Sequence, residues 1–302
     1  MPLVSMRRLL TDAMSGRYAV CYCESWNLES LQAVIEAAEE MRSPVISGFN
    51  GGFLMHPTRA APVRLCYYAG FARALRESSV PVAFLLNETD NLTQIEEGIE
   101  LGFNAVMVES AHLGAEEYRH LVKKVVDIAH ARDISVEAQI GHLPNGWEQS
   151  NGEPTDPKVA RAFVEETGID ALGISIGNVH ILTQGKAAID VASLRKIRKE
   201  VEVPLVVHGG TGFPAEYAAE VIGLGVAKFN FGTNLKQTYL STVREKLADY
   251  SEPMNPHPFL GIGGKKDIFM AARRAVKQKV KELIKAYGYA GAARESLAGR
   301  VA

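Results

Sequence analysis

Val207-His208-Gly209-Gly210-Thr211-Gly212 and Lys228-Phe229-Asn230-Phe231-Gly232-Thr233-Asn234 are the two stretches that decide the fold of this chain. Each follows a β-branched apolar run and leads into a helical pattern, so each predicts the outgoing end of a strand. Glycines at such a place leave backbone N–H groups bare beside a helix N-terminus, an arrangement that binds phosphate. Two tight turns without a ligand are the alternative, which is less favoured because a histidine stands beside the first glycine pair.

The same unit, an apolar run followed by an amphipathic helical pattern, recurs along the rest of the chain. We expect strands at residues 18–23, 44–49, 80–86, 105–108, 134–140, 171–176, 204–207 and 227–231. The intervening helices are expected at residues 28–41, 62–77, 92–101, 115–131, 157–167, 191–200, 214–223 and 235–250. Continuous apolar strands alternating with helices indicate a parallel sheet covered by helices. Eight such units favour a closed (β/α)8 TIM barrel over an open doubly wound sheet.

Two further helices flank the eight units. Residues 1–18 predict a short amphipathic helix that plugs the bottom of the barrel, and residues 267–288 predict an extra C-terminal helix with a basic polar face. Helices appended after the eighth unit often pack on a neighbouring subunit, so we expect a homodimer or homotetramer. With no low-complexity linker, the sequence predicts a single domain over residues 1–302.

Composition excludes several classes of function. The 302 residues are 47% hydrophobic and 23% charged, with a net charge of −2 spread over the chain, so neither a nucleic acid nor a membrane surface is an expected partner. No apolar run is long enough to span a bilayer, and the N-terminus lacks a signal-peptide apolar region. Cys21 and Cys23 are two residues apart on a predicted strand, so we expect free buried thiols and a cytoplasmic location.

In a (β/α)8 barrel the residues that end the strands face one pocket. The residues at those positions are polar: Glu24, Asn50, Asn87, Glu88, Glu109, Gln139, His180, His208 and Asn230. His180 and His208 lie one βα unit apart, so both imidazoles can reach the same point. Two imidazoles and a carboxylate predict a divalent-metal site with open positions.

Two other features of the pocket leave alternatives open. Lys228 is either a Schiff-base lysine or an ion-pair partner, and the histidine pair makes a metal the simpler electrophile. The long loop at residues 141–157 is either a mobile lid that carries Glu148 or Glu153, or a solvated surface loop.

Taken together, these motifs resemble the class II, metal-dependent ketose-bisphosphate aldolases, the family of fructose- and tagatose-bisphosphate aldolases. The likeness runs nearly end to end through Met1-Pro2-Leu3-Val4-Ser5, Asn27-Leu28-Glu29, Ser43-Pro44-Val45-Ile46, Gly102-Phe103-Asn104-Ala105-Val106-Met107, Val136-Glu137-Ala138-Gln139-Ile140-Gly141, the two glycine motifs and Tyr287-Gly288-Tyr289-Ala290-Gly291. The resemblance implies a TIM barrel whose two late zinc histidines are His180 and His208. It also implies phosphate contacts at Gly209, Gly210, Thr211, Asn230, Gly232 and Thr233.

The third strand end departs from the family pattern. There the family carries His-x-Asp-His-Gly, in which the aspartate handles the substrate proton and the next histidine binds zinc. This chain reads Leu85-Leu86-Asn87-Glu88-Thr89, which puts an amide and a carboxylate at those two positions. Four other positions differ: Glu24 stands for asparagine, Glu109 for aspartate, Gln139 for glutamate, and Ile181 for the glycine after the metal histidine.

The favoured hypothesis is therefore a metal-dependent aldolase-type lyase that cleaves or forms a C–C bond of a phosphorylated ketose through a metal-stabilised enediolate. His180, His208 and Glu88 hold the cation, most favourably zinc, with manganese, cobalt or iron also compatible with this ligand set. Glu24, Glu109 or a lid acid moves the proton, and Asn87 orients a hydroxyl. Two alternatives remain: an epimerase, isomerase or other lyase on a phosphorylated compound, and a phosphosugar-binding protein without catalysis.

Overall fold

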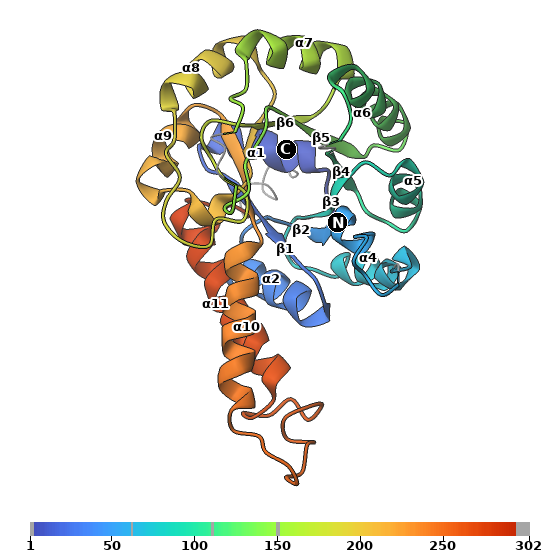
Figure 1. Cartoon of the computed structure of the whole chain (residues 1–302), viewed down its shortest axis with the longest axis vertical. Coiled ribbons are helices and arrows are strands. Elements are labelled where there is room, and N and C mark those ends of the chain that lie inside the picture. Colours follow the sequence, from blue (N-terminus) through green and yellow to red (C-terminus); the bar gives the residue numbers. More distant parts are fainter. Residues whose placement is uncertain (1–2, 62, 110–111, 149–151, 294–302) are drawn as a thin grey trace, which may run out of the picture.

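The structure, a computed structural model, describes residues 3–61, 63–109, 112–148 and 152–293. Within these residues eight parallel strands close into a barrel in chain order, with β8 paired to β1 (Figure 1). The strands are β1 Val20–Glu24, β2 Val45–Asn50, β3 Val82–Thr89, β4 Ala105–Val108, β5 Ser135–Ile140, β6 Ala171–Ile174, β7 Leu205–Val207 and β8 Val226–Phe231. The predicted (β/α)8 barrel is confirmed.

Helices surround the barrel on its outer face (Figure 1). Those between the strands are α2 Leu28–Met41, α3 Gly51–Leu54, η1 Leu65–Tyr68, α4 Ala69–Leu75, α5 Leu92–Glu100, α6 Ala115–His130, α7 Pro157–Thr167, α8 Val191–Glu200, η2 Gly210–Gly212, η3 Ala215–Tyr217 and α9 Ala218–Gly223. The chain begins with α1 Met6–Gly16 and ends with α10 Thr233–Leu247 and α11 Ile268–Ala286. No helix of the described segments is long and apolar enough to cross a membrane.

Two predicted helices are shorter than expected because each opens with a 3₁₀ turn. The helix predicted at residues 62–77 is η1 followed by α4, with residue 62 outside the described part, and the one predicted at 214–223 is η3 followed by α9. Turns of this tighter kind are common at helix ends. The sequence also missed α3, because Gly51 and Gly52 disfavour a helix. The side chain of Asn50 caps it by accepting a bond from the backbone N–H of Phe53 at 2.9 Å.

Helix α1 covers the end of the barrel at which the strands begin, as predicted. The backbone N–H of Arg7 donates to Ser135 Oγ at 3.0 Å, and that of Val4 donates to Val82 O at 2.9 Å. Ser135 and Val82 are the first residues of β5 and β3, so α1 lies opposite the strand ends that carry the polar residues. Residues 1–2 of the predicted helix lie outside the described part.

Helices α10 and α11 extend beyond the barrel as a stalk, which also includes the turn at residues 248–267 (Figure 1). One face of α11 is fixed to α2 by ion pairs and hydrogen bonds. Arg273 donates to Gln32 at 2.7 Å, and Lys277 and Lys281 lie 2.8 and 2.9 Å from the carboxylate of Glu40. The predicted C-terminal helix is thus present and is fixed to α2 along one face.

The cysteines are free thiols. Cys21 and Cys23 are fully buried in β1, as predicted, and burial raises the pKa of the Cys21 thiol to about 12, against a weaker lowering by its bond with Tyr289. Both thiols therefore act as small apolar side chains of the core. Cys66 is exposed.

Candidate active site

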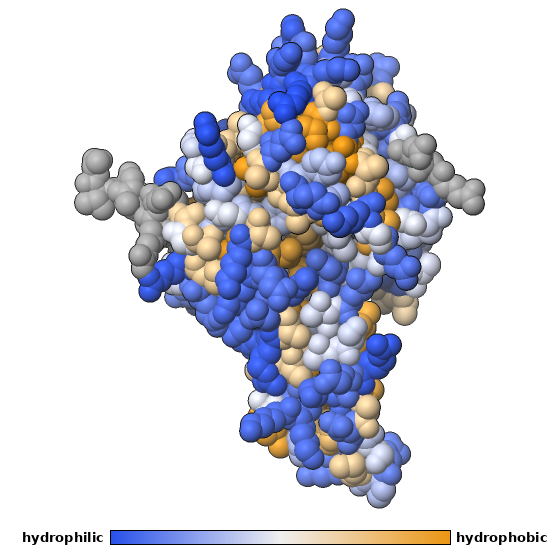
Figure 2. All heavy atoms as spheres, turned by 90° about the vertical axis from the view of Figure 1, so that its left-hand side faces the viewer, coloured by the Kyte–Doolittle hydropathy of each residue, from blue (hydrophilic) through white to orange (hydrophobic). Residues whose placement is uncertain are grey.

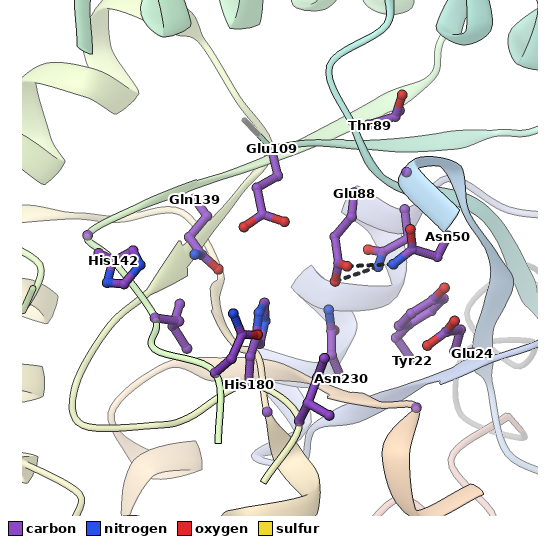
Figure 3. A pocket seen from close by; sticks show the side chains of 18 of the residues that line it. Tyr22, Glu24, Asn50, Glu88, Thr89, Glu109, Gln139, His142, His180 and Asn230 are labelled. Atoms are coloured by element: carbon purple, nitrogen blue, oxygen red, sulfur yellow. Dashed lines mark hydrogen bonds between the residues drawn. The ribbon is translucent and has the colours of Figure 1, made fainter. Parts of the chain in front are cut away.

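A cavity of about 1110 Å3 opens at the end of the barrel where the strands finish. It brings together most of the residues that the sequence placed there: Glu24, Asn50, Asn87, Glu88, Glu109, Gln139, His180 and Asn230. His208 is fully buried next to them, directly after β7. The convergence expected from the barrel is therefore observed (Figure 3).

Glu88, His180 and His208 form the one group of at least three potential metal ligands found within the described residues. One ligating atom from each lies within 4.8 Å of the others. The two imidazole rings have centroids 5.5 Å apart, and His208 Nδ1 lies 3.6 Å from Glu88 Oε1. These spacings leave room for a small cation among the three side chains.

His208 Nδ1 is a buried nitrogen without a hydrogen-bond partner among the described residues. The other nitrogen of the ring, Nε2, lies 2.8 Å from Glu137 Oε1. A buried polar atom without a partner costs free energy unless something else binds it. An imidazole whose second nitrogen is bonded to a carboxylate, and whose first nitrogen faces two further ligands, is the usual environment of a metal-bound histidine. The donor set therefore fits a divalent cation.

A bulge in β3 explains how two consecutive residues face the cavity. Successive side chains of a regular strand point to opposite faces. The pairing of β3 with β4 shifts register between Leu86 and Thr89, and Glu88 adopts a left-handed backbone with φ of 53°. Both Asn87 and Glu88 consequently line the cavity. A non-glycine residue in this conformation is strained by about 1–2 kcal/mol, which is typical of functional sites.

Amides hold the Glu88 carboxylate in place. Asn50 Nδ2 donates to Oε2 at 2.5 Å, and Asn87 Nδ2 donates to Oε1 at 2.9 Å (Figure 3). Because Asn50 and Asn87 are paired across β2 and β3, the two donors come from neighbouring strands. The Oδ1 atom of Asn87 is buried and has no hydrogen-bond partner in the described chain, so it remains available to accept a bond.

The loop after β6 carries His180 and is bonded to the preceding long loop. The backbone N–H of His180 donates to Pro144 O at 2.9 Å, and Gly146 N–H donates to His180 O at 2.8 Å. Ile181 follows with φ of 50°, a conformation that a β-branched residue rarely adopts. This strain gives a physical reason for the glycine that the family has here.

Among the described residues, hydrogen bonds hold both ends of the long loop at residues 141–157. Besides the bonds to His180, His142 and Glu153 pair across its base as an antiparallel bridge. Glu153 lines the cavity, whereas Glu148 is exposed and accepts a bond from Asn145. Residues 149–151, the middle of the predicted lid, lie outside the described part.

Next to Glu88, His180 and His208 lies a fully buried charged network that the sequence did not predict. Glu137 lies between His208 Nε2 at 2.8 Å and Lys228 Nζ at 2.7 Å, and Lys228 also donates to Asn230 Oδ1 at 2.7 Å. Lys228 is therefore an ion-pair partner, the second of its two interpretations. One signal was present: Glu137 is two residues from Gln139, on the same face of an otherwise apolar strand.

The carboxylates around His208 favour positive charge at this point. Burial by itself lowers the pKa of His208, but its hydrogen bond with Glu137 and the nearby carboxylate of Glu88 outweigh burial and raise the pKa to about 9. Burial raises the pKa of Glu88, but the contact with His208 and the charge of His180 lower it to about 2. Such a site attracts a cation more strongly than a neutral ligand.

Glu109, directly after β4, has the opposite electrostatic character. Burial and the nearby charge of Glu88 raise the pKa of this carboxyl to about 7. Its side chain points into the same space as those of Glu88, Gln139 and His180 (Figure 3). A carboxyl that titrates near neutral pH and faces the reacting groups is suited to general acid–base catalysis.

Glu24 and Lys236 form an ion pair at the β1 side of the cavity. Glu24 Oε1 lies 2.6 Å from Lys236 Nζ, and the pair is largely buried. Burial raises the pKa of Glu24, although the charge of Lys236 opposes this effect. Tyr22 lies on the same strand with its hydroxyl buried and without a hydrogen-bond partner in the described chain. The sequence interpretation missed both Tyr22 and Lys236.

The glycine motifs form a bare stretch of backbone beside the histidines. Gly209 has φ of 72°, and a Cβ there would overlap the carbonyl oxygen of Val179, so only glycine fits. Helix α10 begins in the second glycine motif, at Thr233. Four of the six predicted phosphate contacts, which offer backbone or hydroxyl groups, line the cavity: Gly209, Thr211, Gly232 and Thr233. Asn230 also lines it, with its amide bonded to Lys228 and 3.1 Å from His208 Nε2. Gly210 is buried behind the others.

Comparison with known proteins adds an independent line of support. Residues 4–292 match the family described as "Fructose-bisphosphate aldolase class-II". A fructose-bisphosphate aldolase of Geobacillus stearothermophilus is 34% identical over 299 residues, which cover 97% of this chain and 99% of that protein.

Solved structures agree with this match. The YdjI aldolase of Escherichia coli K12 superposes with a TM-score of 0.77 at 31% identity, over 96% of this chain and 99% of that one. A fructose-bisphosphate aldolase of Campylobacter jejuni superposes with a TM-score of 0.76 over 96% of each chain, and at 18% identity it supports the fold alone.

Proposed function

This chain belongs to the class II fructose-bisphosphate aldolase family and is a metal-dependent aldolase, and we propose that Glu88, His180 and His208 are its metal ligands. The observation that carries the proposal is the buried Nδ1 of His208, which faces Glu88 at 3.6 Å and lacks a hydrogen-bond partner within the described chain. Glu88 thereby supplies a carboxylate at the position where the family has a histidine.

Zinc is the cation that we propose. Two imidazoles and one carboxylate with an open fourth position are a common catalytic zinc site, although manganese, cobalt and iron accept the same ligands. When bound, such a cation supplies Lewis-acid polarisation of the substrate carbonyl. Glu137 fixes the ring of His208, and the amides of Asn50 and Asn87 fix the carboxylate of Glu88.

The substrate is a phosphorylated ketose, whose phosphate we place against the backbone of Gly209 to Thr211 and the N-terminus of α10. Gly232 and Thr233 open that fifteen-residue helix, so unpaired N–H groups and the helix dipole both favour an anion there. Asn230 and the buried Gly210 support this stretch of backbone. The carbonyl end of the substrate then lies near His180 and His208.

Glu109 is the residue that we propose for proton transfer. In cleavage, the hydroxyl on the carbon that becomes the aldehyde gives its proton to Glu109, the C–C bond breaks, and the electron pair of that bond moves toward the carbonyl oxygen to give an enediolate. Glu109 then returns the proton to the carbon of the enediolate that lost the bond, which completes the second product. Condensation reverses each of these transfers. Asn87 Oδ1, which has no hydrogen-bond partner in the described chain, accepts a bond from a neighbouring hydroxyl of the substrate and orients it. Glu24 is less suited to proton transfer because Lys236 holds its carboxylate.

We further propose that the protein is a homodimer or homotetramer assembled through the stalk. Five apolar side chains on the stalk are 41–65% exposed: Leu240, Leu247, Met254, Leu260 and Ile262. Figure 2 shows hydrophobic residues among hydrophilic ones on this projecting part. The three free thiols favour a reducing compartment such as the cytoplasm.

Retro-aldol turnover under metal control tests the proposal. Chelation should abolish cleavage of ketose phosphates by the purified protein, and added zinc should restore it. The variant His208→Ala should show no turnover after the same addition, whereas His257→Ala, at an exposed histidine on the stalk, should behave as the unmodified protein does. Turnover that survives chelation, or that persists in His208→Ala, would refute the assignment.

A further inference from the structure

The cavity carries far more negative than positive side chains. Six carboxylates line it, namely Glu24, Glu88, Asp90, Glu109, Glu153 and Asp156, against one lysine and one arginine, Lys236 and Arg119. A phosphate group carries between one and two negative charges at neutral pH. A phosphate outside the glycine motifs therefore needs one of the two cationic side chains, or it faces carboxylates.

Both cationic side chains are already paired with a carboxylate. Arg119 Nη1 lies 3.0 Å from Glu166 at the outer rim, where both side chains are more than 40% exposed. Lys236 lies deeper in the cavity, 2.6 Å from Glu24, with only 31% of its side chain exposed. The aromatic rings of Phe53 and Trp26 also flank its ammonium group, at 4.6 and 5.9 Å.

Gly232 leaves room for the carboxylate of Glu24. Its Oε2 atom occupies the place that a Cβ at residue 232 would take, so Gly232 and Glu24 fit one another. If a phosphate recruited Lys236, the carboxylate of Glu24 would remain buried beside that phosphate without a partner. Leaving one member of a buried pair uncompensated is strongly unfavourable.

The same side of the cavity offers groups suited to an uncharged hydroxyl. Tyr22 is 1% exposed, and its hydroxyl lacks a hydrogen-bond partner in the described chain. In Figure 3 this side chain lies beside that of Glu24, on the side of Asn50. A hydroxyl donor and a carboxylate acceptor together match the alternating donors and acceptors of a sugar chain.

We propose that Glu24 is a specificity-determining residue: by occupying Lys236, it restricts the enzyme to ketoses with a single phosphate and an uncharged aldehyde half. This inference rests on the proposed function, because it assumes that the one phosphate binds at the glycine motifs. Selectivity here comes from an unfavourable element, a carboxylate placed against the wrong substrate.

Matched substrate pairs test this proposal in the zinc-loaded enzyme. We would measure kcat/KM for the 1-phosphates of fructose, tagatose, sorbose and psicose, and for the 1,6-bisphosphate of each. For the best diastereomer, the monophosphate should exceed the bisphosphate by at least roughly tenfold, the effect of a single unfavourable charge contact. This ratio is measured on the wild-type enzyme alone, so it does not depend on whether a variant folds.

Two variants examine the role of the pair. Glu24→Gln frees Lys236 and should reduce or invert the selectivity ratio, chiefly by lowering KM for the bisphosphate. Glu166→Gln frees Arg119 at the rim in the same way and should leave the ratio unchanged. A wild-type preference for bisphosphates would overturn the proposal, as would a Glu24→Gln ratio equal to that of the wild type or an equal response of both variants. If no ketose phosphate of either kind is cleaved, the proposed function itself fails.

Discussion

At the residue scale, Glu137 connects the stability of the barrel to its chemistry. Its carboxylate bonds to His208 on one side and to Lys228 on the other, with all three side chains fully buried. A carboxylate behind a metal-binding imidazole fixes the orientation of the ring and increases its basicity. Glu137 is therefore a positioning residue, since it acts on the metal through His208.

Glu137→Gln should lower zinc affinity by roughly 10- to 100-fold, the usual cost of losing such a partner. It should also lower the free energy of unfolding by about 3 kcal/mol, because Lys228 loses the charge of its buried partner. Chelator competition measures the affinity, and urea unfolding measures the stability. Asp170→Asn is the matched control, since Asp170 is a buried acid 3.0 Å from His130 at the other end of the barrel. That variant should lose stability but keep zinc affinity, and equal affinities in all three proteins would contradict the role of Glu137.

Glu109 predicts the pH dependence of cleavage. Because burial and Glu88 raise its pKa to about 7, the carboxylate that accepts the proton is present above that pH and is lost as the pH falls below it. A cation bound at Glu88 shifts the pKa of Glu109 downward. The acidic limb of kcat/KM for cleavage should therefore lie at or below pH 7 in the zinc enzyme. Glu109→Gln should remove that limb and lower kcat by about 100-fold or more. A variant that keeps the same limb would show that another group carries the proton.

At the element scale, the loop that carries His180 depends on the long loop after β5. Gly146 packs against it, and a Cβ at Gly146 would lie 2.7 Å from the carbonyl oxygen of Ile181. Gly146→Ala should therefore displace His180 and weaken zinc binding by roughly tenfold or more, with helix content unchanged. Gly70→Ala is the matched control, because a Cβ at Gly70 meets nothing within 4 Å. Zinc titrations that give the same affinity for both variants would show that the two loops are not coupled.

The elements also show what the sequence could predict. Eight apolar runs with helical patterns between them were enough to predict the barrel. Each strand is buried on both faces, so it forms a continuous apolar run, without alternating polar residues, whose limits are easy to recognise. The polar residues at the strand ends followed from that fold, and the pairing of His180 with His208 followed in turn. The sequence did not predict the bulge in β3. This strand continues to Thr89, three residues past its expected end, because cross-strand pairing outweighs the polar character of Asn87 and Glu88.

Contacts between distant residues were beyond the sequence interpretation. Glu137 and Lys228 are 91 residues apart, and Glu24 and Lys236 are 212 apart, so no local pattern indicated either pair. Lys236 is on α10 and reaches over the end of β1, a contact set by the closure of the barrel between β8 and β1. The sequence predicted Tyr22 only as one more apolar residue of a strand, because no local pattern shows that its hydroxyl lies at the cavity.

At the scale of the whole molecule, the stalk predicts assembly. Leu260 and Ile262 are 46% and 65% exposed, and both belong to the turn of the stalk that joins α10 to α11. Leu260→Glu combined with Ile262→Glu should reduce the mass in solution to that of a single chain, 32.9 kDa, by light scattering. Tyr67→Glu is the control: Tyr67 is 71% exposed but belongs to η1, far from the stalk in the chain, and this change should leave the mass unaltered. A double variant that retains the wild-type mass would place the interface elsewhere.

One cation should bind among Glu88, His180 and His208, and anomalous scattering from crystals grown with zinc tests this most directly. We predict a single strong peak per chain, about 2.0–2.2 Å from a nitrogen of each imidazole and from a carboxylate oxygen of Glu88. The peak should disappear in crystals of His208→Ala grown in the same way. An absent peak in the unmodified protein, or one at other side chains, would contradict the account.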